Sequence, residues 1–126
     1  MLTQGEIDEA PKVKLGGKEW PVPLLVPRQQ RVAVPGILHL MPMFSVAAGQ
    51  KQIPQLTEAD FDILVRTVVA GLQRANPSLT VDQFLDTVPA TMTEMIVALG
   101  IIAQQSGLLK HGAVESEPSG EAQGNP

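Results

Sequence analysis

The stretch that decides the fold is residues 56–107, LTEADFDILVRTVVAGLQRANPSLTVDQFLDTVPATMTEMIVALGIIAQQSG, which holds start and stop signals for several helices. Thr57 can open the first helix, because its hydroxyl can accept a hydrogen bond from the backbone N–H of Asp60. Apolar residues then recur at three- and four-residue intervals, so we predict an amphipathic helix over about 58–75. Asn76-Pro77 ends it, since proline cannot continue the hydrogen-bond ladder and restricts the residue before it.

The same kind of start signal returns at Thr80, which Gln83 follows at the spacing of a capping box. We predict a short helix there, interrupted by Val88-Pro89. Pro89 suits the first turn of a further helix, which we expect to run to Ser106 with Gly107 as its C-terminal cap.

The last predicted helix is apolar nearly all round from Met95 to Ala103, whereas a helix on a protein surface normally has a polar back. It is too short to cross a bilayer, which needs about 20 residues. Two interpretations remain open: a helix in the centre of the core, or a helix shared between the core and a second chain. The second interpretation gives our candidate partner-binding residues, which are Met92, Met95, Ile96, Leu99, Ile101 and Ile102.

An alternating segment near the N-terminus predicts a β-hairpin. Lys12 to Leu15 alternates polar and apolar residues, which is the period of a half-buried strand. Gly16-Gly17 can supply the positive φ angles of a tight turn, and Lys18 to Val22 would return as the second strand. Pro21 and Pro23 confine that strand to an edge or end it early.

The segment over residues 28–48 is ambiguous. Its apolar content fits a buried helix, but Pro35 and Pro42 would each break or kink that helix. We therefore expect a helix that begins near Arg28, is disturbed at Pro35-Gly36 and resumes over about 37–48.

These signals together predict a mainly α fold, with a small helical domain over residues 12–109 that includes the short N-terminal β-hairpin. Residues 1–11 are acidic and show no periodicity, so we expect a flexible N-terminal arm. Residues 110–126 are rich in Gly, Ser, Glu and Pro. They cannot bury enough apolar surface to offset their ordering entropy, so we expect a disordered tail or a linker.

Composition narrows the possible functions. The chain has no Cys, which excludes disulfides and thiolate metal sites. Neither His39 nor His111 has a second His at metal-ligand spacing, and no Ser has the neighbourhood of a nucleophile with its base. We therefore expect no enzyme activity, no metal and no cofactor. The net charge of −4, one Trp and no Tyr argue against nucleic acid as a partner, and we expect no membrane segment and no signal peptide.

Charge is unevenly distributed along the chain. Five of the nine basic residues fall within residues 12–31, whereas residues 56–107 carry six acids against Arg66 and Arg74. This asymmetry either steers like subunits together head to tail or reflects ordinary solvated faces.

Several short motifs resemble a known family. They are the run from Lys12 to Trp20, the run from Leu56 to Asp62, the break from Asn76 to Thr80, and the closing Gly107-Leu108. Together they resemble the small tail assembly chaperones of tailed bacteriophages, over about residues 12–109. The proline-rich region from Pro21 to Pro42 departs from that pattern.

The resemblance implies a function without catalysis. Such chaperones bind the tape-measure protein, keep it soluble, and help recruit the tail-tube protein. The resemblance also implies a homo-oligomer that acts in the host cytoplasm during phage assembly and is absent from the mature virion. In many phages a frameshift fuses this domain to a second one, and the segment after Lys110 is where such a linker would lie.

An adaptable apolar surface would serve that function, and thioether side chains can supply it at Met41, Met43, Met92 and Met95, although each also fits simple core packing.

Two other functions remain as alternatives. One is a structural minor tail or connector protein of the virion. The other is a small cytoplasmic regulator that binds nucleic acid through residues 12–31, with an affinity that falls steeply with salt.

Overall fold

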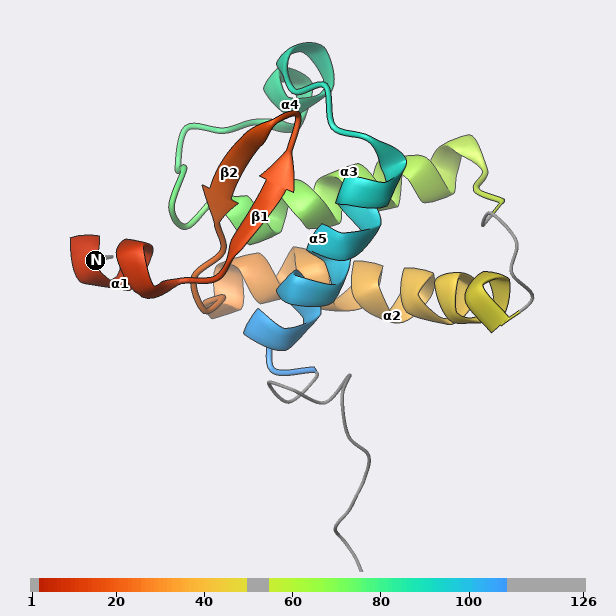
Figure 1. Ribbon diagram of the computed structural model, residues 1–126. Helices are drawn as coiled ribbons and strands as arrows, with labels where there is room; N and C mark the ends of the chain where they lie inside the picture. The colour runs from red at the N-terminus through yellow and green to blue at the C-terminus, as the bar shows by residue number, and fades with distance from the viewer. Residues whose placement is uncertain (1–2, 50–54, 109–126) are drawn as a thin grey trace, which may run out of the picture.

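Helices dominate the computed structural model of the protein, which describes residues 3–49 and 55–108. The elements follow in the order α1 (Gln4–Glu9), β1 (Lys12–Leu15), β2 (Lys18–Pro21), α2 (Pro27–Gly49), α3 (Glu58–Leu72), α4 (Val81–Thr87) and α5 (Met92–Gln105). Helices α2 and α3 lie side by side and antiparallel, and α5 crosses both (Figure 1). The hairpin packs on α5, and α4 packs on α3. The predicted fold class, mainly α with a short N-terminal hairpin, is confirmed.

The hairpin forms where the alternating segment predicts it. Strands β1 and β2 pair antiparallel, with Lys12 opposite Pro21 and Leu15 opposite Lys18. The turn glycines Gly16 and Gly17 have φ angles of 64° and 81°, which side chains disfavour. A Cβ on Gly16 would also come within 2.8 Å of the ring of Pro89. The glycine therefore serves both the turn and its packing against the segment before α5.

Capping boxes start four of the helices. Thr57 and Asp60 begin α3, and Thr80 and Gln83 begin α4, as predicted. Helix α5 begins after Thr91, which forms a capping box with Glu94. The prediction that Pro89 would occupy the first turn of α5 is therefore wrong, because the threonine two residues later offers a hydroxyl to the free N–H groups and proline offers none.

The N-terminal segment also contains an element. Residues 1–11 were expected to form a flexible arm, but Thr3 and Glu6 make a fourth capping box at the start of α1. No residue of this short helix is buried. Its sequence therefore has no apolar stripe from which a helix could be predicted. The predicted disordered tail, residues 110–126, lies outside the described residues.

Helix α2 is continuous, so the predicted disturbance at Pro35-Gly36 is wrong. Pro35 and Pro42 are both exposed, and because they are seven residues apart they share the solvent side of the helix. The opposite side packs on α3 and α5 through buried residues, which are Ala33, Gly36, Ile37 and Leu40. Burial of that side offsets the cost of an interior proline, about 3 kcal/mol or more.

The core lies where α2, α3, α5 and the hairpin meet. Its largest fully buried apolar side chains come from all of these segments, namely Leu15, Val22, Leu40, Leu64, Val65, Val68, Val69, Leu72, Leu99 and Ile102. A close approach between α2 and α3 depends on Gly36, because a Cβ there would overlap the hydroxyl of Thr67. Residue contacts of this kind hold α2 firmly against α3 on one side and leave its other side to solvent.

Candidate partner-binding surface

The six residues predicted to bind a partner all lie on α5, and the structure divides them into two groups. Met95, Leu99 and Ile102 are 4%, 0% and 0% exposed and belong to the core. The fold seals them against α2, α3 and the hairpin, so they are not available to a second chain. The other three, Met92, Ile96 and Ile101, are half-buried.

An apolar strip remains on the outer side of α5. Val97 is 59% exposed. Ile96, Gly100 and Ile101 border it on the helix surface and are partly exposed. The main apolar stripe of α5 therefore packs in the core of the monomer. That a second chain covers the outer strip stays a prediction.

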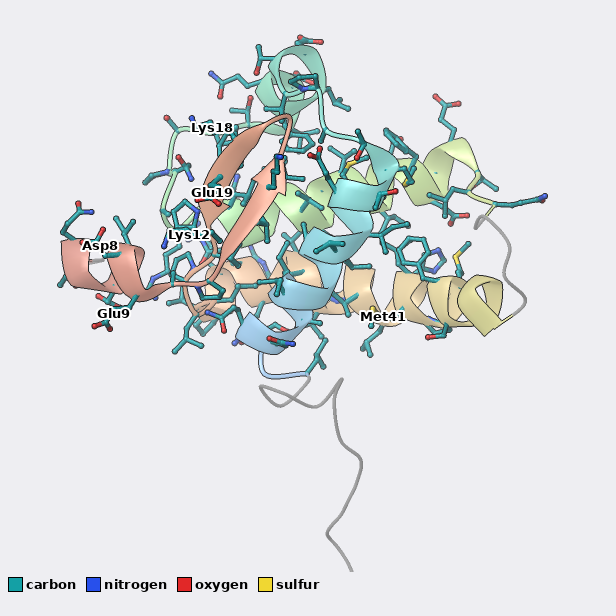
Figure 2. All side chains as sticks on the ribbon, in the orientation of Figure 1. Asp8, Glu9, Lys12, Lys18, Glu19 and Met41 are labelled. Carbon is teal, nitrogen blue, oxygen red and sulfur yellow. The ribbon has the colours of Figure 1, made fainter. Side chains whose placement is uncertain are left out.

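An apolar groove lies between α2 and the C-terminal end of α5, and we call it the α2–α5 groove. Its volume is about 310 Å³, and it is lined by Ile37, Leu38, Met41, Pro42, Ser45, Ala103 and Leu108. No charged side chain is among these residues. Leu38 is 61% exposed, and Met41 lies on α2 near the crossing with α5 (Figure 2). A surface of this composition attracts apolar groups and has no reactive group.

The α2 wall of the groove follows from helix periodicity. Leu38, Met41, Pro42 and Ser45 stand at positions i, i+3, i+4 and i+7, so they share one face. Because α2 is continuous, these positions form a single uninterrupted wall.

The α5 wall is completed by the way that helix ends. Gly107 has a φ angle of 88°. Its N–H donates to the carbonyl of Gln104, and the N–H of Leu108 donates to the carbonyl of Ala103, both at 3.1 Å. This is the Schellman pattern, and it confirms Gly107 as the C-terminal cap. The reversal of the chain places Leu108 beside Ala103, facing α2.

The side of α5 that carries Ala103 also carries two partly exposed residues nearer the start of that helix. Ile96, Gly100 and Ala103 stand at i, i+4 and i+7 and therefore share one side of α5. A Cβ added to Gly100 would meet no atom within 4 Å, so the space beside it is open. None of the six predicted residues is among those that line the groove.

Sequence reasoning missed Leu38, Met41, Pro42 and Leu108 as a surface. Met41 was named only as an adaptable side chain. The signal was present, because four wall positions have helical spacing. It was not sufficient, because the groove also needs Ala103 and Leu108, and no local spacing brings these residues beside α2.

A polar contact joins α2 to the first turn of α3. His39 on α2 lies 2.8 Å from the Oδ1 atom of Asp60 on α3, measured from the Nε2 atom of the imidazole. The other carboxylate oxygen of Asp60 accepts the N–H of Thr57. The hydrogen bond to His39 and that from Thr57 lower the pKa of Asp60 below its ordinary value of 3.8. His39 is thus a boundary residue that holds two helices together.

The possible metal ligands in residues 3–49 and 55–108 are scattered over the fold. In that part of the chain, no three His, Cys, Asp or Glu side chains gather closely enough to hold a metal ion. None of the helices described there combines the length and the apolar content that crossing a membrane requires.

Comparison with known proteins gives no relative: no protein-family model, no curated protein and no solved structure matches this chain.

Proposed function

We propose that this protein is a tail assembly chaperone of a tailed bacteriophage, which holds an apolar segment of the tape-measure protein in the α2–α5 groove. The observation that supports binding is the groove itself, an uncharged surface with Leu38 61% exposed at its edge. Contiguous exposed apolar surface, as opposed to single exposed apolar residues, marks contact sites and binding grooves in soluble proteins. The identity of the partner rests on the sequence motifs that resemble the family.

The shape of the groove suits a helical segment. Its two walls are helices, and a partner helix can insert apolar side chains at positions i, i+3 or i+4 and i+7. Met41 gives the α2 wall an adaptable thioether, which tolerates partners of different shape.

The strength of such binding suits a chaperone. Each large apolar side chain that becomes buried contributes about 1.5–3 kcal/mol, from which the cost of association is subtracted. Two or three such anchors hold a segment without trapping it. The tape-measure protein is then kept soluble in the host cytoplasm and released when tail-tube subunits assemble, and the chaperone does not enter the mature virion.

Co-expression with the tape-measure protein of the same phage tests this proposal. We expect the wild-type chain to keep the tape-measure protein in the soluble fraction and to copurify with it. The variant Leu38→Asp should lose both effects, because it puts a charge at the edge of an apolar groove. The matched control is Leu24→Asp, since Leu24 is 59% exposed but lies outside the groove.

Two results would contradict the proposal. One is a tape-measure protein whose solubility does not depend on this chain. The other is equal copurification with the Leu38→Asp and Leu24→Asp variants. Mass spectrometry of purified particles addresses the remaining part, because stoichiometric presence in the virion would favour a structural tail component instead.

A further inference from the structure

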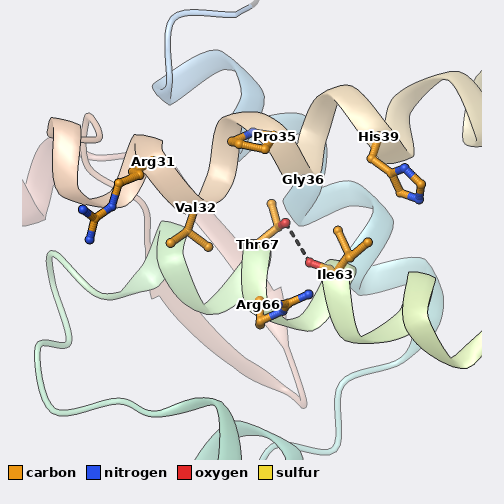
Figure 3. A pocket seen from close by; sticks show the side chains of 8 residues that line it. All are labelled: Arg31, Val32, Pro35, Gly36, His39, Ile63, Arg66 and Thr67. Atoms are coloured by element: carbon orange, nitrogen blue, oxygen red, sulfur yellow. Dashed lines mark hydrogen bonds between the residues drawn. The ribbon is translucent and has the colours of Figure 1, made fainter.

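A second surface, beside the groove on α2 but lined by other residues, has an apolar centre and a basic edge. A hollow of about 390 Å³ lies between α2 and α3 (Figure 3). Val32, Pro35 and Ile63 contribute its apolar lining, with Arg31 from α2 and Arg66 from α3. Val32 is 44% exposed. The hollow therefore fits an apolar side chain that is accompanied by negative charge.

The short helix α4 carries a feature with the opposite charge. Leu85 is 49% exposed, although it is a large apolar residue. Asp82 precedes it by three residues and Asp86 follows it directly, and both are exposed. Within the described residues, neither aspartate forms an ion pair. We call these three residues the α4 knob.

The knob and the hollow are neighbours on one face of the molecule. A smaller hollow next to α4 is lined by Asp62, Val65, Arg66, Val81 and Leu85. Arg66 lines both hollows, so it marks their common border. The face formed by α2, α3 and α4 thus contains an apolar projection with acids next to an apolar recess with arginines.

A patch that contains both a projection and its matching recess is self-complementary. Two copies related by a two-fold axis satisfy both features at once, because each copy supplies the projection for the other. We propose that two copies of this chain form a dimer in which Leu85 of each enters the α2–α3 hollow of the other. Asp82 and Asp86 then face Arg31 and Arg66 of the second copy.

Charge complementarity selects a second copy over an unrelated partner. The whole chain carries a net charge of −4, so two copies repel each other except where a basic region meets an acidic one. The α2–α3 hollow is such a basic region and the knob is such an acidic one. Association should therefore weaken as salt rises. This proposal does not depend on the tape-measure partner, because the α2–α5 groove and the α2–α3 hollow share no lining residue.

Sedimentation velocity of the full 126-residue chain at low salt, over a range of concentrations, tests the dimer. We expect a monomer–dimer equilibrium for the wild type. Leu85→Ala, Arg31→Glu and the double variant Asp82→Lys, Asp86→Lys should each weaken it at least about tenfold. The matched control is Leu24→Ala, an exposed leucine that lines neither hollow, which should dimerise like the wild type. Circular dichroism checks that each variant is folded.

Mixing the charge-reversed chains gives the sharper test. The double variant Arg31→Glu, Arg66→Glu mixed with Asp82→Lys, Asp86→Lys should form a heterodimer of about wild-type affinity. In that pair one contact joins Lys to Glu and the other joins Asp to Arg, so both contacts attract. A wild-type chain that stays monomeric, variants that dimerise unchanged, or a mixture that does not associate would each overturn the proposal. So would a mass that keeps rising beyond the dimer, because two-fold contacts close.

Discussion

Helices α2 and α5 both carry long uncharged runs, yet the fold uses them in opposite ways. Helix α5 lies against α2, α3 and the hairpin, and its stripe of Met95, Leu99 and Ile102 is buried. Helix α2 is covered on one side only, and its other side exposes Leu38 and Val32. The difference teaches that apolar content alone does not identify the surface helix. What identifies it is the number of helices and strands that pack against each helix.

The largest effect expected from this comparison is on stability. Leu99→Ala on α5 should lower the free energy of unfolding by about 3–4 kcal/mol, because it leaves a cavity at a fully buried site. Leu38→Ala on α2, which removes the same atoms from an exposed site, should change it by less than about 0.5 kcal/mol. Urea denaturation of both variants measures the difference. Similar losses would mean that the outer side of α2 is covered within the monomer.

A second pair of substitutions sharpens the comparison at glycines. Gly36→Ala should destabilise the protein by about 2 kcal/mol, since the new methyl group would overlap Thr67 where α2 meets α3. Gly100→Ala on the open side of α5 should stabilise it by up to about 1 kcal/mol, because alanine favours the helix and meets no neighbour. Thermal unfolding followed by circular dichroism reports both signs. Loss of stability in both variants would contradict the open space beside Gly100.

The smallest expected effect is the loss of stability at low pH. It concerns the two carboxylates that join α5 to the hairpin and α3 to α2. Glu94 of the α5 capping box accepts the N–H of Thr91 and that of Gly16 in the hairpin turn, and these bonds lower its pKa below the ordinary 4.5. Asp60, which ties α3 to α2 through His39, also has a lowered pKa. A carboxylate whose pKa is lowered by folding stabilises the fold above its ordinary pKa. That stability is lost as pH falls through the lowered value.

We therefore expect the free energy of unfolding to fall as the pH drops below about 4.5, and less so in Glu94→Gln. Glutamine can still cap, as Gln83 does at the start of α4, but it does not titrate. Urea denaturation at neutral pH and near pH 3 measures the change, with substitution of the exposed Glu19 (Glu19→Gln) as the control. An acid sensitivity in Glu94→Gln equal to that of the wild type would show that this bridge contributes nothing.

Local signals predicted much of the fold. The hairpin, the starts of α3 and α4, and the cap at Gly107 were all readable, because each depends on a few adjacent residues with defined hydrogen-bonding needs. The start of α5 was misplaced only because Thr91 and Glu94 were passed over in favour of Pro89. In each case the rule was sufficient once it was applied to the right residues.

The surface features could not be predicted in the same way. Whether α2 survives Pro35 and Pro42 depends on how much of its other side is buried, and that is decided by α3 and α5. The same tertiary contacts decide that Leu99 is inside and Leu38 outside. The α2–α5 groove needs residues from two helices more than 50 positions apart, so no local pattern contains it.

Pro42 has a further effect on that groove. It has no N–H, so the carbonyl oxygen of Leu38, four residues earlier, lacks the donor that an ordinary helical turn would provide. The surrounding hydrocarbon attracts any apolar segment without regard to direction. The carbonyl oxygen of Leu38, without that donor, can accept a hydrogen bond from another group. A segment that donated to it would lie in one register and one direction, which hydrocarbon alone leaves undefined.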